Sequence, residues 1–149
     1  MKQEMRSKCT IYAVIDTNVI VSALLSLPKE TNPSIVLLEL LHGRIVPLYN
    51  DEILTEYREV LSRDKFPFKK NDIDSLLNYF SLFGIDSKRI MTDRSVFPDP
   101  KDIVFYEISL SKEDSYLVTG NIKHFPKSPK VITPAEMVVI LKSHANLPH

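Results

Sequence analysis

A run of apolar and β-branched residues at positions 11–15 ends abruptly in the carboxylate of Asp16. Such a continuous run is typical of a parallel strand covered on both faces, and open α/β sheets bind their ligands beyond the carboxyl ends of these strands. The run therefore predicts a buried strand that delivers Asp16 to the edge of a sheet where ligands bind. A second interpretation is that Asp16 only caps a helix that starts near Asn18. The strand alone leaves both interpretations open.

Segments with strand and helix patterns alternate along the whole chain, without an internal repeat or a linker long enough to divide it. This alternation is typical of α/β architecture with a mainly parallel sheet. A chain of 149 residues has the size of one compact domain, so we expect a single domain over residues 1–149. The predicted strands are 11–15, 44–49, 116–119 and 130–132, and the segment 85–91 is a candidate edge strand.

Capping and stop signals predict where the helices begin and end. Asn32 before Pro33 predicts a helix with Asn32 as its cap, and Gly43 predicts its end. Asn50 predicts the cap of the next helix. Further helices are expected from residue 71 to Gly84, after 99–102, and after the capping box at 133–136. Their apolar stripes recur at helical spacing: Ile53, Tyr57, Val60 and Leu61; Ile73, Leu76, Leu77 and Phe80; Ile103, Tyr106 and Leu110.

Composition narrows the classes of function. The chain is 44% apolar and 26% charged, and no apolar stretch is long enough to cross a bilayer, so no membrane role is expected. Residues 1–8 do not form a secretory signal, and we expect a cytoplasmic protein. The single cysteine, Cys9, excludes an intramolecular disulfide, and with four scattered histidines a zinc site is not expected. Any metal would be held by oxygen atoms.

The formal net charge is zero, so no global field draws the chain toward nucleic acid. Local basic clusters are present, and solvated loop charges explain them equally well. They comprise Lys65, Lys69 and Lys70 in one segment and Lys123, His124, Lys127 and Lys130 in another.

Three further polar positions lie where an alternating topology would bring them near Asp16. Glu56 borders the apolar stripe of its helix, although a solvated surface position is the plainer interpretation. Asp102 follows Asp99 and Pro100, where a carboxylate also favours a helix start, and Asp99 is the alternative ligand. The third is the strand end at 119–121, which a simple turn also explains. Oxygen ligands gathered at one sheet edge suit Mg²⁺ or Mn²⁺, which assist displacement at phosphorus.

These motifs resemble the PIN-domain family of metal-dependent ribonucleases, which includes the VapC-type toxins of bacterial toxin–antitoxin pairs. The resemblance covers nearly the whole chain. It rests on four motifs in order: Val14-Ile15-Asp16-Thr17-Asn18 with the helix that follows, Ile53-Leu54-Thr55-Glu56-Tyr57 with Val60-Leu61, Asp99-Pro100-Lys101-Asp102, and Leu117-Val118-Thr119-Gly120. At the next position many relatives carry a fourth aspartate, whereas this chain has Asn121, a neutral and poorer metal ligand.

The resemblance implies a three-layer α/β/α fold with a Rossmann-like, mainly parallel sheet and a ribonuclease that uses Mg²⁺ or Mn²⁺. It implies that Asp16 and Asp102 bind the cation, and that Glu56 binds it or orients the attacking water. Further residues would act on the substrate: Thr17 and Asn18 would position the carboxylates or the scissile phosphate, Thr119 would brace the strand end, Asn121 would contact a water or the phosphate, and Lys123 would contact the substrate backbone. A protein antitoxin and a homodimer are the partners it implies besides RNA.

Two other functions compete with this one. Phosphatases of the haloacid dehalogenase type also place an aspartate at the end of the first strand, but they need a second acid two residues later, where this chain has Asn18. A non-enzymatic alternative takes Asn121 as the mark of a weakened site in a domain that binds RNA or protein.

Overall fold

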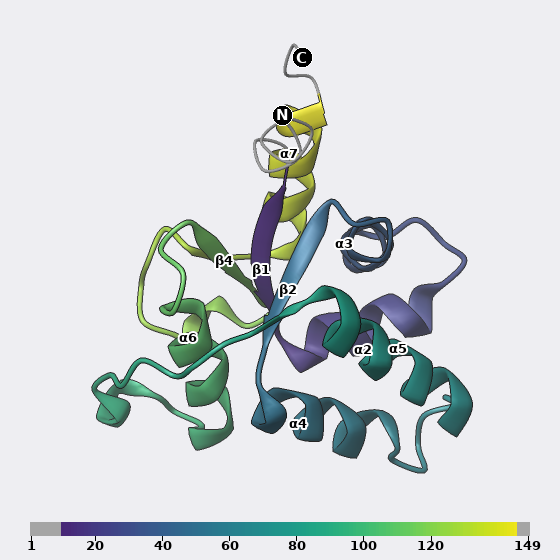
Figure 1. Ribbon diagram of the computed structural model, residues 1–149, viewed down its shortest axis with the longest axis horizontal. Helices are drawn as coiled ribbons and strands as arrows, with labels where there is room; N and C mark the ends of the chain where they lie inside the picture. The colour runs from purple at the N-terminus through teal and green to yellow at the C-terminus, as the bar shows by residue number, and fades with distance from the viewer. Residues whose placement is uncertain (1–9, 146–149) are drawn as a thin grey trace.

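The computed structural model describes residues 10–145, and its centre is a five-stranded parallel sheet in the order β3-β2-β1-β4-β5 (Figure 1). The expected α/β fold is confirmed, and every strand pair is parallel. The expectations about residues 1–8 and Cys9 lie outside the described residues. The strands are β1 (Ile11–Ile15), β2 (Ile45–Tyr49), β3 (Ile85–Asp86), β4 (Ser115–Val118) and β5 (Val131–Ile132).

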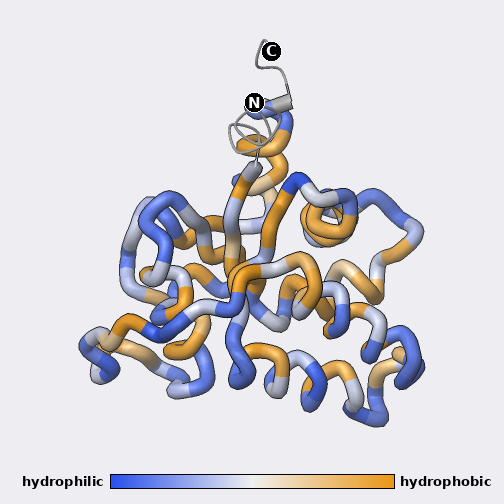
Figure 2. The backbone as a smooth tube through the Cα atoms, in the orientation of Figure 1, coloured by the Kyte–Doolittle hydropathy of each residue, from blue (hydrophilic) through white to orange (hydrophobic). Residues whose placement is uncertain are grey.

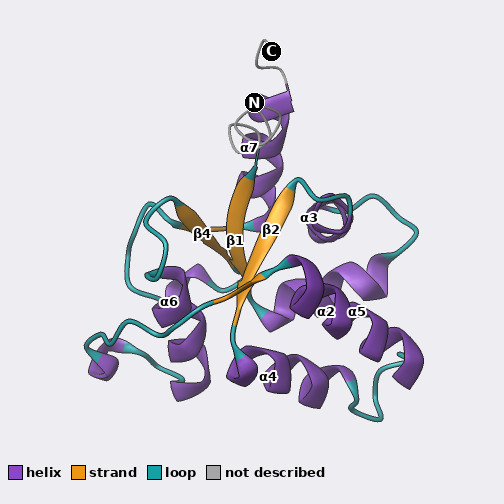
Figure 3. Ribbon diagram, viewed as in Figure 1, coloured by secondary structure: helices purple, strands orange, loops and turns teal. Residues whose placement is uncertain are grey.

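Helices cover the sheet in a three-layer α/β/α arrangement (Figure 3). Helix α3 packs against α2 and α7, and α4 packs beside α5. Helix α6 lies against β1, β2 and β4. None of the helices within residues 10–145 is both long and apolar enough to cross a membrane. The helices are α2 (Thr17–Ser26), α3 (Asn32–Leu41), α4 (Asp51–Leu61), α5 (Lys70–Phe83), α6 (Ile103–Ser109) and α7 (Pro134–Ala145).

Most helix signals act as the sequence predicts. Asn50 caps α4 by accepting a hydrogen bond from the backbone N–H of Ile53 at 2.9 Å. The capping box is confirmed, since Thr133 and Glu136 exchange hydrogen bonds at the start of α7. Gly43 takes a positive φ of 87° after α3, a conformation that only glycine adopts without strain. These local contacts set where each helix starts and stops.

Three predicted boundaries are wrong. The cap of α3 is Thr31 rather than Asn32. The Thr31 hydroxyl accepts a hydrogen bond from the backbone N–H of Ser34, and the Ser34 hydroxyl accepts one from the backbone N–H of Thr31. The edge strand β3 has only two residues, since the chain leaves the sheet after Ser87 to cross toward α6. The helix expected after Asp99 begins as a 3₁₀ turn over Pro100–Asp102, and α6 starts at Ile103.

The core ties α4 to the carboxyl end of β1. Figure 2 shows hydrophobic stretches along the central strands, and along the helices it shows hydrophobic segments interspersed with hydrophilic ones. Tyr57 of α4 is fully buried, and its ring centroid lies 5.3 Å from that of Phe80 and 6.2 Å from that of Phe105. Its hydroxyl donates a hydrogen bond to the carbonyl of Ile15. Glu56, the preceding residue, is therefore held beside the end of β1.

Candidate active site

Asp16 lies at the carboxyl end of β1 and is only 5% exposed. It occupies the N-cap position of α2, but its side chain makes no capping hydrogen bond. Its Oδ2 atom instead accepts from the hydroxyl of Thr119 at 2.7 Å and from the amide of Asn18 at 3.2 Å. The side chain is thus held across the sheet edge, which the simple capping interpretation does not explain.

A small hydrogen-bond network joins the ends of β1 and β4. The backbone N–H of Gly120 donates to the Asn18 side-chain oxygen at 3.1 Å, and that of Asn121 donates to the Thr119 hydroxyl at 2.9 Å. A Cβ atom on Gly120 would lie 3.4 Å from the Asn18 oxygen, so the strand end passes close to α2. Asn18, in the first turn of α2, and Thr119, directly after β4, therefore both brace the Asp16 carboxylate.

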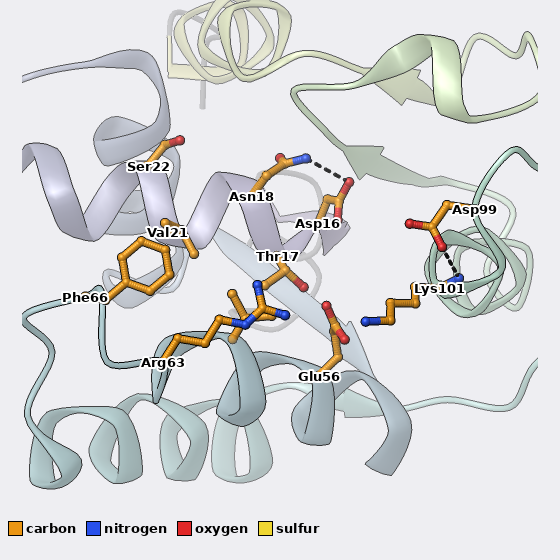
Figure 4. Close-up of a pocket in the computed structure, with 11 residues that line it drawn as sticks. Asp16, Thr17, Asn18, Val21, Ser22, Glu56, Arg63, Phe66, Asp99 and Lys101 are labelled. Atoms are coloured by element: carbon orange, nitrogen blue, oxygen red, sulfur yellow. Dashed lines mark hydrogen bonds between the residues drawn. The ribbon is translucent and has the colours of Figure 1, made fainter.

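Asp16 opens onto a pocket with a volume of about 450 Å³ (Figure 4). Glu56 and Asp99 line the same pocket, so acids from three separate segments of the chain meet there. The Glu56 carboxylate makes no hydrogen bond or ion pair with any residue in 10–145. The other lining residues are Thr17, Asn18, Val21, Ser22, Val60, Arg63, Phe66 and Lys101.

Asp102 is not among the lining residues but lies close enough to act on them electrostatically. Its Oδ2 atom is 3.2 Å from Nδ1 of His124. Asp99, which the sequence gives as the alternative ligand, does line the pocket and also caps the 3₁₀ turn through the backbone N–H of Lys101 at 3.0 Å. The Asp99–Asp102 turn therefore presents one acid to the pocket and the second beside it.

Burial, together with neighbouring carboxylates, raises the pKa values of Asp16, Glu56 and Asp102. Burial raises the pKa of Asp16 to about 6, and the charges of Asp102 and Glu56 add to this effect, whereas the Thr119 hydrogen bond opposes it. Burial also raises the pKa of Glu56, with Glu59 and then Asp102 contributing, while the positive charge of Lys101 lowers it. The pKa of Asp102 is raised by burial and then by Asp99, and His124 counteracts this. A cation bound among these carboxylates would reduce the repulsion between them.

The donors have the chemical character that Mg²⁺ and Mn²⁺ prefer, since all are carboxylate oxygens. A second sign of an incomplete site is the hydroxyl of Thr17, which is buried in the pocket wall without a hydrogen-bond partner. As the side chains stand, no three His, Cys, Asp or Glu residues within 10–145 are close enough together to hold a metal ion. A metal held by all three carboxylates of Asp16, Glu56 and Asp102 would therefore require Glu56 or Asp102 to change its side-chain conformation.

Asn121 lies apart from the acids. Its side chain is exposed, and the residue lines a neighbouring pocket together with Lys123 and His124. The structure thus brings Asp16, Thr17, Asn18 and Glu56 into one pocket, keeps Thr119 and Asp102 next to it, and leaves the Asn121 side chain outside.

The pocket residues that are absent from the sequence-based site include two basic side chains and one aromatic ring: Arg63, Lys101 and Phe66. In Figure 4 the ammonium group of Lys101 points toward Glu56 from the opposite wall. A signal for Arg63 is present in the sequence, because Glu56, Val60 and Arg63 follow the i, i+4, i+7 spacing of one helix face. Lys101 gives no such signal, since its direction depends on the 3₁₀ turn that carries it.

Glu107 of α6, one and a half turns after Asp102, is a further acid with another role. It is completely buried, and its Oε1 atom accepts hydrogen bonds from Arg89 at 2.8 Å and from Arg94 at 3.0 Å. Thr92 also donates to it through its backbone at 2.9 Å. Together these contacts hold the pKa of Glu107 down at about 2 despite its burial. Glu107 therefore anchors the 89–94 segment to α6 and does not line the acidic pocket.

Comparison with known proteins agrees with this geometry. A search of curated proteins and a search of solved structures each found no significant match. The family model of the PIN domain matches residues 12–123, a span that runs from β1 through the end of β4 and includes each of the acids described above. PIN domains bind nucleic acid and are generally metal-dependent nucleases, so the match indicates a nuclease-type function. The chain belongs to the PIN domain family.

Proposed function

We propose that this protein is a ribonuclease that cleaves RNA phosphodiester bonds with the help of Mg²⁺ or Mn²⁺. The observation that carries the proposal is the buried carboxylate of Asp16, whose pKa is raised to about 6 by burial and by the charges of Asp102 and Glu56. Acids that repel one another at the carboxyl edge of a parallel sheet are arranged to receive a cation. A structural role alone gives no reason to keep such a group ionised and buried.

Asp16, Glu56 and Asp102 would hold the cation, which when bound activates water and neutralises charge that develops on the phosphate. Asn18 and Thr119 keep the Asp16 carboxylate oriented through their hydrogen bonds to Oδ2. Glu56 has no competing partner and can accept a proton from water as a general base. The unpartnered hydroxyl of Thr17 is placed to donate to a phosphate oxygen in the pocket.

Within the PIN domain family, we assign the protein to the toxins of toxin–antitoxin pairs. The support is the likeness of the Asp16-Thr17-Asn18 and Glu56-Tyr57 motifs to those of VapC-type ribonucleases. This assignment carries with it a protein antitoxin, a homodimer and a cytoplasmic site of action. Induced expression in bacteria should arrest growth, and co-expression of the protein encoded next to it should restore growth. Normal growth on expression of an active nuclease would overturn the toxin role.

A second candidate function is that of a domain that binds RNA or protein without cleaving. The observations in its favour are the neutral Asn121 in place of an acid and the separation of the carboxylates. Titration of Mn²⁺ by calorimetry separates the two functions, because a site that has lost catalysis through lost ligands binds no metal.

The direct test is incubation of the protein with end-labelled single-stranded and structured RNA in Mg²⁺, in Mn²⁺ or in EDTA. We expect cleavage only with a metal. Asp16→Asn and Glu56→Gln should each slow it about 100-fold or more, because even groups that only orient metal ligands change activity 10- to 100-fold. Glu113→Gln is the control, since Glu113 is an exposed acid outside the pocket. Cleavage that survives Asp16→Asn, or that proceeds in EDTA, contradicts the proposal.

A further inference from the structure

The acidic pocket has a second end with different chemistry. In Figure 4, Asp16, Glu56 and Asp99 lie toward one side, whereas Phe66 and Val21 lie toward the other, with Arg63 between them. Val60 adds a further apolar surface to this pocket. An open pocket with acids at one end and an aromatic, aliphatic and guanidinium wall at the other is larger than a metal ion needs. Its composition matches a ligand with an anionic part and a flat apolar part.

Arg63 is placed to bind an anion. Its side chain makes no hydrogen bond and no ion pair with any residue in 10–145, although its charge lowers the pKa of Glu56. In Figure 4 its guanidinium group points toward the space below Thr17. Guanidinium groups bind phosphate oxygens in a bidentate manner. The buried, unpartnered Thr17 hydroxyl on the same wall supplies a second donor for that anion.

Phe66 provides an ordered aromatic surface. The ring is half-buried and stacks on Phe68, with centroids 5.4 Å apart and planes inclined by 22°. The ammonium group of Lys65 lies 5.1 Å from the centroid of the Phe66 ring. Lys65 is exposed, so its flexible side chain can leave the ring and move toward a phosphate. A flat base could then cover the ring, as aromatic side chains do in proteins that bind single strands.

We propose that Arg63, Phe66 and Val21 form a nucleotide subsite next to the acids, in which Arg63 and Thr17 hold a phosphate and Phe66 with Val21 contacts one unstacked base. This inference rests on the proposed function, because it takes nucleic acid as the ligand of the pocket. It adds residues that would set the position of the strand relative to the acids. The same residues would favour substrates in which the bound base is unpaired.

The test uses binding in place of cleavage, in the Asp16→Asn background so that the RNA stays intact. Fluorescence anisotropy gives the Kd for a labelled single-stranded RNA hexamer and for hexamers with one abasic position moved along the strand. Phe66→Leu should weaken binding of the intact hexamer about fivefold or more, the loss expected for one stacked base. One abasic hexamer should bind more weakly on its own and show no further loss with Phe66→Leu. This coupling would not follow from a general effect on folding.

Arg63→Gln should weaken the binding of all hexamers. It should also make the negative slope of log K against log salt concentration shallower by about 0.7, the value for one phosphate contact on a single strand. Arg58→Gln is the matched control, because Arg58 lies on α4, shortly before Arg63, but pairs with Asp74 at 2.6 Å. Phe83→Leu is the matched control for loss of an exposed ring. Thermal melts verify that each variant is folded.

Two sets of results overturn the subsite. One is an unchanged salt slope in Arg63→Gln together with equal losses on intact and abasic hexamers in Phe66→Leu. The other is that the parent protein binds none of the hexamers. In that case the pocket wall would serve a different ligand, such as a peptide. If the protein with Asp16 intact shows metal-dependent cleavage together with either set, the proposal of a ribonuclease stands and only the proposal of the subsite fails. If the predicted coupling between Phe66→Leu and one abasic position is found but the protein with Asp16 intact never cleaves RNA, the proposal of the subsite stands and the proposal of a ribonuclease fails.

Discussion

The hydroxyl of Thr119 donates a hydrogen bond across 2.7 Å to the buried carboxylate of Asp16, and this bond joins the ends of β4 and β1. Thr119 itself is completely buried, so no water replaces the donor if it is removed. Thr119→Val keeps the shape and deletes the bond. We expect the pKa of Asp16 to rise further above about 6, and the free energy of unfolding at pH 8 to fall by about 1–3 kcal/mol.

Urea denaturation at pH 8 and pH 4 measures this effect, and the loss should be smaller at pH 4, where Asp16 is protonated. Thr119→Ser is the control because it retains the hydroxyl. Equal losses in the valine and serine variants at both pH values would mean that packing of the methyl group matters and the hydrogen bond does not.

Asp16 itself should destabilise the protein at neutral pH. Its folded pKa of about 6 lies above the ordinary value of 3.8, so the folded state binds the proton more tightly than the unfolded state. This destabilising contribution is absent below pH 3.8 and reaches its full size above pH 6. Asp16→Asn should therefore raise the free energy of unfolding at pH 8 by as much as about 3 kcal/mol, and change it little near pH 4.

Thermal melts in EDTA at the two pH values check this prediction. Added Mg²⁺ should stabilise the parent protein more than Asp16→Asn, because a ligand that binds only the folded state stabilises it. A variant that is less stable than the parent at pH 8 would show that Asp16 serves the fold more than the site.

Glu107 has the opposite pH dependence. Its folded pKa of about 2 lies below the ordinary value of 4.5, so its stabilising contribution is present above pH 4.5 and is lost as pH falls toward 2. Glu107→Gln should lower the free energy of unfolding at pH 7 by about 3 kcal/mol, since it leaves Arg89 and Arg94 without their shared partner. Those arginines are partly exposed, and water limits the loss.

Chemical denaturation at pH 7 and pH 3 measures this effect, with exposed Glu113→Gln as the control. Hydrogen exchange should also quicken at the backbone amide of Thr92, which donates to Glu107. A cost that is the same at both pH values would argue against an ionised Glu107 in the folded protein.

Local signals account for the parts of the fold and site that the sequence predicts well. The apolar run before Asp16 becomes the central strand β1, and the helical spacing of Ile53, Tyr57 and Val60 correctly predicts the buried face of α4. Glu56 follows from the same period, because a residue next to that stripe lies at the edge of the buried face. These predictions need only periodicity and capping chemistry.

Other features depend on contacts between segments far apart in sequence. The 3₁₀ turn at Pro100–Asp102 brings residues i and i+3 to the same side, so Asp99 faces the pocket and its charge raises the pKa of Asp102. The exposure of Asn121 follows from the Thr119 hydrogen bond to its backbone and from the 3₁₀ turn after it. Neither arrangement leaves a periodic pattern in the sequence.

The most direct measurement is the anomalous difference map of a crystal soaked in Mn²⁺ at pH 8, where Asp16 is ionised. The proposed function predicts a peak in the acidic pocket in contact with carboxylate oxygens of Asp16, Glu56 and Asp102, and no peak there in Asp16→Asn. A map without a peak in that pocket, or with Mn²⁺ bound only by residues elsewhere, would contradict it.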